Sequence, residues 1–193
     1  MSHTSYQPKG VHFQHVADYV VVGSGAGGAT IASSLARGGG DVAVVEAGPW
    51  RTPEDYPNSM YGAMRDMLDD WGTLLTRGKV FWPVVQASLV GGSTVINSAI
   101  VVRTPGDIFE DWQRDHGFGG DELAQRLWGY QEELEQELFV GEAAATVRGQ
   151  SNDVAMRAAR ALGFKGHFMR RNIRNCAGSG QCLQGCRKDR KQS

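Results

Sequence analysis

The clearest chemistry in this sequence lies in a glycine turn at residues 23–28, Gly-Ser-Gly-Ala-Gly-Gly. The turn satisfies the pattern G-x-G-x-x-G, and each of the three glycines has a mechanical role. Gly23 permits a tight turn out of a strand, Gly25 lets the backbone approach a diphosphate, and Gly28 lets the next helix pack closely on that strand. The first N–H groups of that helix, and the positive end of its dipole, would bind the diphosphate of a dinucleotide. The turn residues expected to contact the ligand are Gly23, Ser24, Gly25, Ala26, Gly27 and Gly28.

A carboxylate stands where dinucleotide folds place an acid for a ribose. Glu46, followed by Ala47, ends a second β-branched run roughly 20 residues beyond the turn. Its carboxylate would accept hydrogen bonds from ribose hydroxyls and would repel a 2′-phosphate, so the sequence disfavours NADP. A glycine-rich turn without any ligand is the alternative. The turn and the acid together do not decide between FAD and NAD.

A second glycine cluster occupies residues 89–97, Leu-Val-Gly-Gly-Ser-Thr-Val-Ile-Asn. The adjacent Gly91 and Gly92 would let the chain run flat against a large planar ring and its diphosphate. A domain for a nicotinamide cofactor alone has no need of such a segment, so the cluster favours FAD. An ordinary β-hairpin is the alternative for the same residues. Neutral donors and acceptors for flavin edges and phosphate oxygens would come from Ser93, Thr94 and Asn97.

The second cluster resembles the first signature of the glucose-methanol-choline (GMC) oxidoreductases, in which two glycines, two small residues, a variable residue and an apolar residue precede Asn or His. The agreement continues in order through residues 46–49, 103–107, 109–112 and 191–193. The resemblance spans residues 17–193. It implies an α/β fold: a Rossmann-like FAD-binding domain with a parallel sheet and a βαβ dinucleotide fold, incomplete relative to the family. It also implies oxidation of a CH–OH group of an alcohol or sugar, with hydride transfer to the flavin.

Two departures from the family pattern concern the cofactor. Family members commonly carry a basic residue shortly before the double glycine, where this chain has Val-Val-Gln-Ala-Ser at 84–88. The cations Arg77 and Lys79 lie further back, so the sequence does not support a direct charge contact with the phosphates. Some members attach FAD covalently through a histidine just before the Asn. Ile96 stands at that position, so FAD is expected to bind non-covalently.

Three cysteines, Cys176, Cys182 and Cys186, read C-x5-C-x3-C. Overlaid on the ferredoxin run C-x2-C-x2-C-x3-C-P, they leave Ser179 where one cysteine is missing and Arg187 where the proline stands. The spacing is similar to that of a few membrane-linked sugar dehydrogenases of the family. That similarity implies a three-iron four-sulfur (3Fe-4S) cluster and an electron-acceptor protein such as a cytochrome. A loop without metal and a three-ligand zinc site stay open as alternatives.

The bulk composition is that of a globular protein and excludes several classes. Of the 193 residues 41% are hydrophobic and 21% charged, and the formal net charge is −1. The chain lacks the basic excess that nucleic acid or an anionic membrane requires. No stretch approaches the ~20 apolar residues of a membrane span. Since residues 1–16 show no apolar signal-peptide region and the cysteines are confined to one loop, a cytoplasmic location is expected.

The elements that must position these groups follow from hydrophobic periodicity. β-branched runs at 18–22 and 41–46 predict strands, and the helical spacing over 29–37 predicts a helix between them. Together they form a βαβ unit with a right-handed crossover. Residues 1–16 are expected to be an irregular lead-in, and residues 17–193 the N-terminal portion of the FAD-binding domain. Further expectations are helices near 58–70, 108–114, 121–138 and 151–162, a turn at 105–107 and a loop over 170–193.

The remaining charged residues carry no predicted chemistry. Arg170, Arg171 and Arg174 are expected to form a solvated face, with docking of an electron acceptor as the weaker alternative. The charged row over 121–137 is expected to be an exposed helix side. No histidine is assigned a role.

The resemblance also defines what this chain is expected to lack. In the family a histidine, usually paired with another His or an Asn, removes the hydroxyl proton as a general base. Those residues lie far downstream, so the catalytic residues are unknown in this sequence. The chain is therefore expected to be truncated or incompletely described, and inactive alone. The electron acceptor, whether oxygen, a cytochrome or a quinone, is undetermined. The alternative function is a non-catalytic dinucleotide-binding module, or a remnant acting with another subunit.

Overall fold

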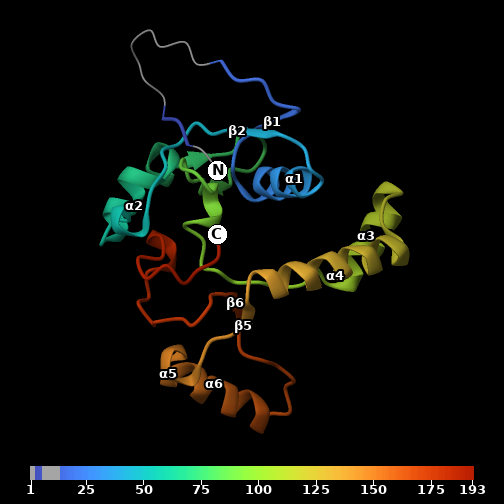
Figure 1. Cartoon of the computed structure of the whole chain (residues 1–193). Helices are drawn as coiled ribbons and strands as arrows, with labels where there is room; N and C mark the ends of the chain where they lie inside the picture. The colour runs from blue at the N-terminus through green and yellow to red at the C-terminus, as the bar shows by residue number, and fades with distance from the viewer. Residues whose placement is uncertain (1–2, 6–13) are drawn as a thin grey trace. The chain divides into compact units, whose positions relative to one another are not determined.

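The computed structural model describes residues 3–5 and 14–193 (Figure 1). The described residues divide into two compact units: the first runs up to Asn97 and includes Gln181–Arg187 and Ser193, and the second comprises Ser98–Gly180 and Lys188–Gln192. Residues 3–5 and 14–16 have no regular secondary structure. The rest of the lead-in, which includes His12, lies outside the described residues.

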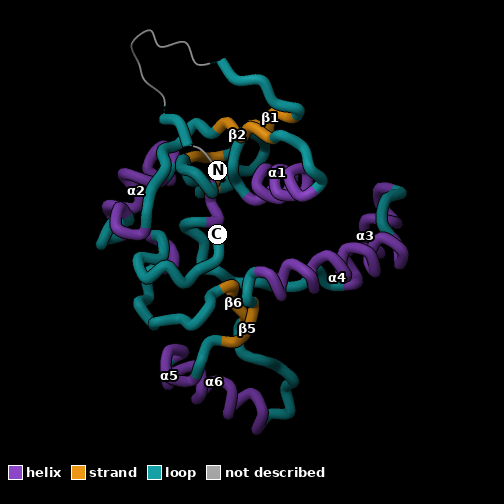
Figure 2. Tube along the Cα trace, viewed as in Figure 1, coloured by secondary structure: helices purple, strands orange, loops and turns teal. Residues whose placement is uncertain are grey.

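The predicted βαβ unit opens the first unit. Strand β1 (Tyr19–Val22) leads through the glycine turn into helix α1 (Ala26–Arg37), and strand β2 (Val42–Val45) follows. The two strands pair in parallel, with Tyr19 opposite Val42 and Val22 opposite Val45. This arrangement confirms the βαβ unit (Figure 2). Helix α1 begins three residues before the predicted start at 29, because its first residues, Ala-Gly-Gly, carry no large apolar side chain that would reveal the helical period.

The rest of the first unit consists of short elements. Helix α2 covers only part of the predicted 58–70, because the Ser59 hydroxyl caps its start by accepting from the Gly62 N–H at 3.1 Å and Leu68 is extended at its end. Strands β3 and β4 form a small antiparallel pair. The elements are the 3-10 helix η1 (Pro53–Asp55), α2 (Met60–Met67), η2 (Asp69–Gly72), β3 (Leu74–Leu75), β4 (Pro83–Val84), η3 (Gly92–Thr94) and η4 (Cys182–Gln184).

The core of the first unit lies beneath the second glycine cluster. Leu89 is 1% exposed and Ile96 is 6% exposed, and both pack with Met67 of α2. Burying one such side chain stabilises the fold by roughly 1.5–3 kcal/mol, so this core gives the glycine segment a firm base. The full set of buried core residues is Ala63, Met67, Ala87, Leu89, Val95 and Ile96, with Tyr56 and Leu68 partly buried against it.

The second unit is mainly helical. Helices α3 and α4 pack through Phe109, which is 2% exposed, with its ring centroid 5.6 Å from the ring centroids of both Trp112 and Trp128. No helix within the described ranges is long and apolar enough to cross a membrane. The elements are α3 (Gly106–His116), α4 (Gly120–Glu137), β5 (Val140–Glu142), α5 (Ala145–Arg148), α6 (Gln150–Ala161) and β6 (Arg170–Asn172).

Two expectations for the second unit were wrong. The turn predicted at 105–107 is instead the start of α3, because Pro105 occupies the N-cap position and its fixed φ of −61° suits the helix entrance. The loop predicted over 170–193 contains β6, which pairs antiparallel with β5 so that Val140 faces Asn172. The sequence Arg-Arg-Asn has no apolar alternation, so only its pairing with β5 identifies it as a strand.

The expected solvated arginine face was wrong for Arg170 and Arg171, which are partly buried, and the expected exposed charged side of α4 was wrong at Glu135. Glu135 is 7% exposed, and its two carboxylate oxygens accept bidentate bonds from Arg103 at 3.1 and 2.8 Å and from Arg170 at 2.9 and 2.7 Å. These bonds lower the pKa of Glu135 to about 2, with the largest effect from Arg103. Arg171 donates to the Ser98 carbonyl at 2.6 Å, and the Arg174 guanidinium lies 4.5 Å from the Phe139 ring centroid.

Candidate functional site

The two glycine clusters meet in the first unit, although they are far apart in the sequence. The Ser24 hydroxyl accepts a hydrogen bond at 2.9 Å from the N–H of Gly91, which is 67 residues away. A Cβ placed on Gly92 would lie 3.0 Å from the Gly25 Cα, so the two backbones are nearly in contact. The turn that follows β1 and the loop that carries η3 therefore form one continuous surface.

The glycines of the turn serve two different purposes. Gly23 has a φ of +90°, which only glycine adopts readily, and it turns the chain out of β1. A Cβ on Gly28 would lie 1.9 Å from the Gly23 carbonyl oxygen, so helix α1 can approach β1 only without a side chain there. At Gly25 and Gly27 an added Cβ meets nothing within 4 Å. Those two glycines face open space through which a ligand can reach the backbone.

The start of α1 offers unused backbone donors. The first helical hydrogen bond runs from the Ala29 N–H to the Gly25 carbonyl at 2.8 Å, so the N–H groups of residues 26–28 precede the helical ladder. Within the described part of the chain, no side chain caps this end and no acidic residue stands in its first turn. An uncapped helix start of this kind suits an anion such as a diphosphate.

Glu46 follows β2 and is held in one orientation before any ligand arrives. Its Oε2 accepts from the Ser24 N–H at 2.8 Å and from the Ser24 hydroxyl at 2.7 Å, and its Oε1 accepts from the Gly48 N–H at 2.9 Å. Partial burial raises the pKa of Glu46, but the bonds from Gly48 and Ser24 outweigh it and hold the pKa below its ordinary value. A carboxylate has about four acceptor positions, so capacity remains for a ribose hydroxyl.

The second cluster is a tight 3-10 turn, so the hairpin alternative was wrong. Gly91 and Gly92 have φ values of +93° and +56°, and η3 follows directly. The Ser93 hydroxyl accepts from the Ala87 N–H at 3.1 Å, and the Thr94 hydroxyl donates to the Gly91 carbonyl at 2.6 Å. Both hydroxyls thus shape the loop itself. The side chains of Ser93 and Asn97 are exposed.

The chemistry of these groups fits a dinucleotide. Free backbone N–H groups suit a diphosphate, one ionised carboxylate suits a ribose, and neutral hydroxyl and amide groups suit a ring system with polar edges. Ile96, which stands where some GMC enzymes carry a flavin-linked histidine, is buried in the core and has only carbon atoms in its side chain. The cations expected to lie away from the site, Arg77 and Lys79, are exposed on the segment between β3 and β4.

The cysteine loop gives no support to a metal centre. Cys182 and Cys186 belong to the first unit and Cys176 to the second, and none of the three forms a disulfide. Across residues 3–5 and 14–193, no group of three or more His, Cys, Asp or Glu side chains is placed to hold a metal ion. The 3Fe-4S cluster expected at these cysteines, and the zinc alternative, are therefore unsupported. Spacing along a glycine-rich loop does not by itself bring three thiolates to one point.

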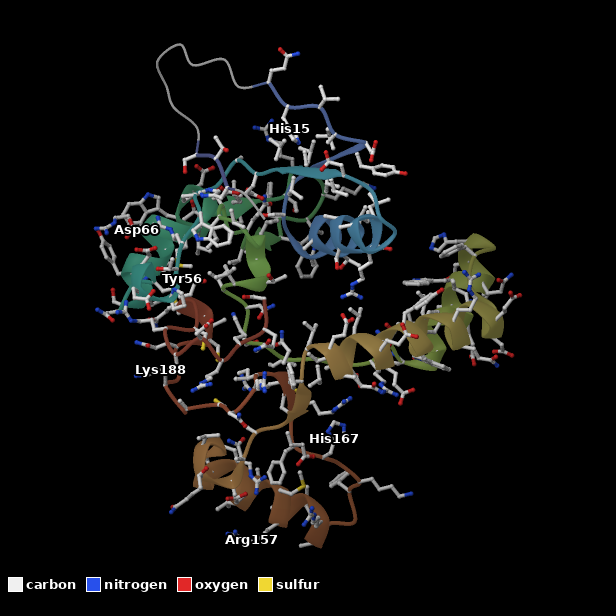
Figure 3. All side chains as sticks on the ribbon, in the orientation of Figure 1. His15, Tyr56, Asp66, Arg157, His167 and Lys188 are labelled. Carbon is white, nitrogen blue, oxygen red and sulfur yellow. The ribbon has the colours of Figure 1, made fainter. Side chains whose placement is uncertain are left out.

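His15 and His167 are not among the residues of the two glycine clusters. His15 precedes β1, with its Nε2 3.9 Å from an Asp41 carboxylate oxygen, and both side chains are at least half exposed (Figure 3). His167 is exposed after α6, with its Nδ1 2.8 Å from the Phe168 carbonyl oxygen.

Comparison with known proteins identifies one matching family and two relatives. Residues 17–193 match the family model described as GMC oxidoreductase. A GMC-type oxidoreductase of Mycobacterium tuberculosis is 34% identical over 177 residues, which cover 88% of this chain and 27% of that protein. A long-chain-alcohol oxidase of Arabidopsis thaliana is 30% identical over 197 residues, which cover 95% of this chain and 25% of that protein.

A solved structure agrees with the fold. An FAD-dependent oxidoreductase from Chaetomium thermophilum superposes with a TM-score of 0.55 at 19% identity, over 91% of this chain and 36% of that one. The likeness shows a shared α/β fold, of which this chain covers only a part. The chain spans about a quarter of the length of both curated relatives.

Proposed function

Because the chain belongs to the GMC oxidoreductase family, we propose that the glycine-lined surface of its first unit binds FAD for the oxidation of a CH–OH group. The observation that carries the proposal is the meeting of the two glycine clusters beside Glu46 and the uncapped start of α1. When bound, FAD would supply the hydride acceptor. In this proposal residues 17–193 are the N-terminal portion of one FAD-binding domain, to which both units belong.

In this proposal, different residues of the surface bind different parts of FAD. The backbone N–H groups of residues 26–28 bind the diphosphate, and Glu46 accepts from the ribose hydroxyls. The second cluster, which lies against Gly25, brings Gly91 and Gly92 to the ligand without side chains in the way. Ser93, Thr94 and Asn97 provide polar groups toward the flavin end.

The substrate we propose is a small-molecule alcohol, which includes sugars. The plant relative is named as a long-chain-alcohol oxidase, which supports an alcohol as donor and oxygen as acceptor. No residue of this chain is assigned as the general base. The competing function is a non-catalytic FAD-binding module or a remnant acting with another subunit. Alcohol-dependent reduction of a dye by the purified chain would favour the enzyme and would contradict the expectation that this chain is inactive alone.

Ligand specificity tests the proposed surface directly. Isothermal titration calorimetry of the purified chain is expected to show FAD binding at least about 100-fold tighter than FMN binding, because FMN lacks the second phosphate and the adenosine ribose that α1 and Glu46 would hold. NADP should bind more weakly than NAD, since its 2′-phosphate would face the Glu46 carboxylate. Equal affinities for FAD and FMN would contradict the assignment of α1 and Glu46.

The attachment of the flavin is a separate prediction. Ile96 offers no nucleophile at the position where some family members link FAD through histidine, so the flavin should bind non-covalently. Acid precipitation of the FAD-loaded chain should leave the yellow flavin in the supernatant. Flavin retained in the washed pellet would contradict the prediction and would point to attachment at another residue.

A further inference from the structure

A single hydroxyl group joins the three segments of the proposed FAD surface. Ser24 is 8% exposed, and its hydroxyl donates to Glu46 Oε2 at 2.7 Å while it accepts from the Gly91 N–H at 2.9 Å. One oxygen atom therefore connects the first glycine turn, the residue after β2 and the second glycine cluster. Alanine or glycine at this position would keep the backbone bond to Glu46 and lose both side-chain bonds.

We infer that Ser24 is a positioning residue of this surface: its hydroxyl fixes the Glu46 carboxylate and the Gly91 backbone together in the arrangement that FAD requires. The inference rests on the proposed function. It adds that the ribose-binding and flavin-binding halves are not independent, because one side chain sets the geometry of both.

The Glu46 carboxylate is the first group that the Ser24 hydroxyl positions. With Ser24 bound to Oε2 through two donors and Gly48 bound to Oε1, the carboxylate cannot rotate without breaking a charge-assisted bond. Its remaining acceptor positions are therefore already oriented when a ribose arrives. Pre-orientation of this kind raises affinity because the carboxylate loses its conformational entropy when the chain folds and not when the ligand binds.

The Gly91 backbone is the second group that the Ser24 hydroxyl positions. Adjacent glycines have the largest backbone freedom of any dipeptide, so Gly91 and Gly92 lose the most entropy when they are held in one conformation. Their φ values of +93° and +56° define a single tight turn, and the Ser24 hydroxyl anchors its first N–H. Loss of this anchor leaves the core residues beneath the loop in place but frees the segment that faces the ligand.

The experiment compares FAD affinity of the purified wild-type chain with that of Ser24→Ala, Ser24→Thr and Ser33→Ala. Ser24→Ala should weaken FAD binding by roughly tenfold or more, the loss expected for a hydrogen bond to a charged group. Ser24→Thr retains the hydroxyl and should recover most of that affinity. Ser33→Ala removes an exposed hydroxyl on α1 and should leave affinity unchanged.

A double-mutant cycle separates positioning from general loosening. If Ser24 acts through Glu46, then Ser24→Ala should cost clearly less affinity in a Glu46→Gln background than in the wild type. Hydrogen exchange of residues 87–97 without FAD should be faster in Ser24→Ala than in the wild type. Additive losses, or exchange rates that do not change, would overturn the inference.

The outcomes also distinguish the inference from the function on which it rests. A wild-type chain that takes up no FAD overturns the proposed function, and the inference with it. A wild-type chain that binds FAD beside a Ser24→Ala variant of equal affinity overturns the inference alone.

Discussion

Gly28→Ala should strongly weaken FAD binding and destabilise the first unit. The new Cβ would lie 1.9 Å from the Gly23 carbonyl oxygen and 3.0 Å from its carbonyl carbon. Both atoms are backbone, so no side-chain rotation can relieve the overlap, and α1 must move away from β1. Overpacking of this kind costs about 1–3 kcal/mol or more. Because the start of α1 moves with it, FAD affinity should fall by more than about 100-fold, measured by calorimetric titration.

Gly27→Ala is the matched control for stability. It lies one residue earlier in the same helix, and a Cβ there meets nothing within 4 Å. Alanine in a helix is about 1 kcal/mol more favourable than glycine, so thermal unfolding should shift upward or stay constant. If Gly28→Ala and Gly27→Ala unfold at the same temperature, the close approach of α1 to β1 is not what Gly28 provides.

Glu135→Gln should destabilise the second unit by about 1–2 kcal/mol at pH 7. The bonds from Arg103 and Arg170 lower the pKa of Glu135 from 4.5 to about 2, so the folded state prefers the charged form. Removing one member of a buried ion pair typically costs about 3–5 kcal/mol, but the side chains of Arg103 and Arg170 are 42% and 30% exposed, and solvent screening reduces the cost. Hydrogen exchange of the β5 and β6 amides would report the loss.

The pH dependence of that effect has a definite sign. The folded pKa lies below the unfolded one, so the stabilisation is fully present above pH 4.5 and is lost as the pH falls toward 2. Glu135→Gln should therefore show a flatter stability profile than the wild type across this range. Glu132→Gln is the matched control, since Glu132 on the same helix is 63% exposed and 4.0 Å from Arg103. It should cost under about 0.5 kcal/mol, and equal losses in both variants would contradict the account.

The parts of the fold that sequence could predict are those set by local patterns. The βαβ unit follows from two β-branched runs and the helical spacing between them, and all three elements lie within 27 residues of one another, from Tyr19 to Val45. Helix α4 follows from its apolar repeat in the same way. The predicted boundaries of the elements were less accurate where residues lack the large apolar side chains that reveal a helical period, as at the start of α1.

Long-range contacts account for what sequence could not predict. The ion pairs of Glu135 join residues 32 and 35 positions apart, and nothing in the charge row of α4 distinguishes this glutamate from its neighbours. Strand β6 exists because β5 pairs with it. The link from Ser24 to Gly91 spans 67 positions. For the proposed site, motif spacing predicted the individual residues but not the contacts that join them through the Ser24 hydroxyl.

The visible spectrum of the purified chain, followed by release and identification of its cofactor, tests the central claim most directly. The account predicts a yellow protein with two flavin bands that releases FAD on denaturation, with the glycine-lined surface of the first unit as its binding site. A chain that stays colourless after incubation with excess FAD, or that releases a different nucleotide, would contradict it.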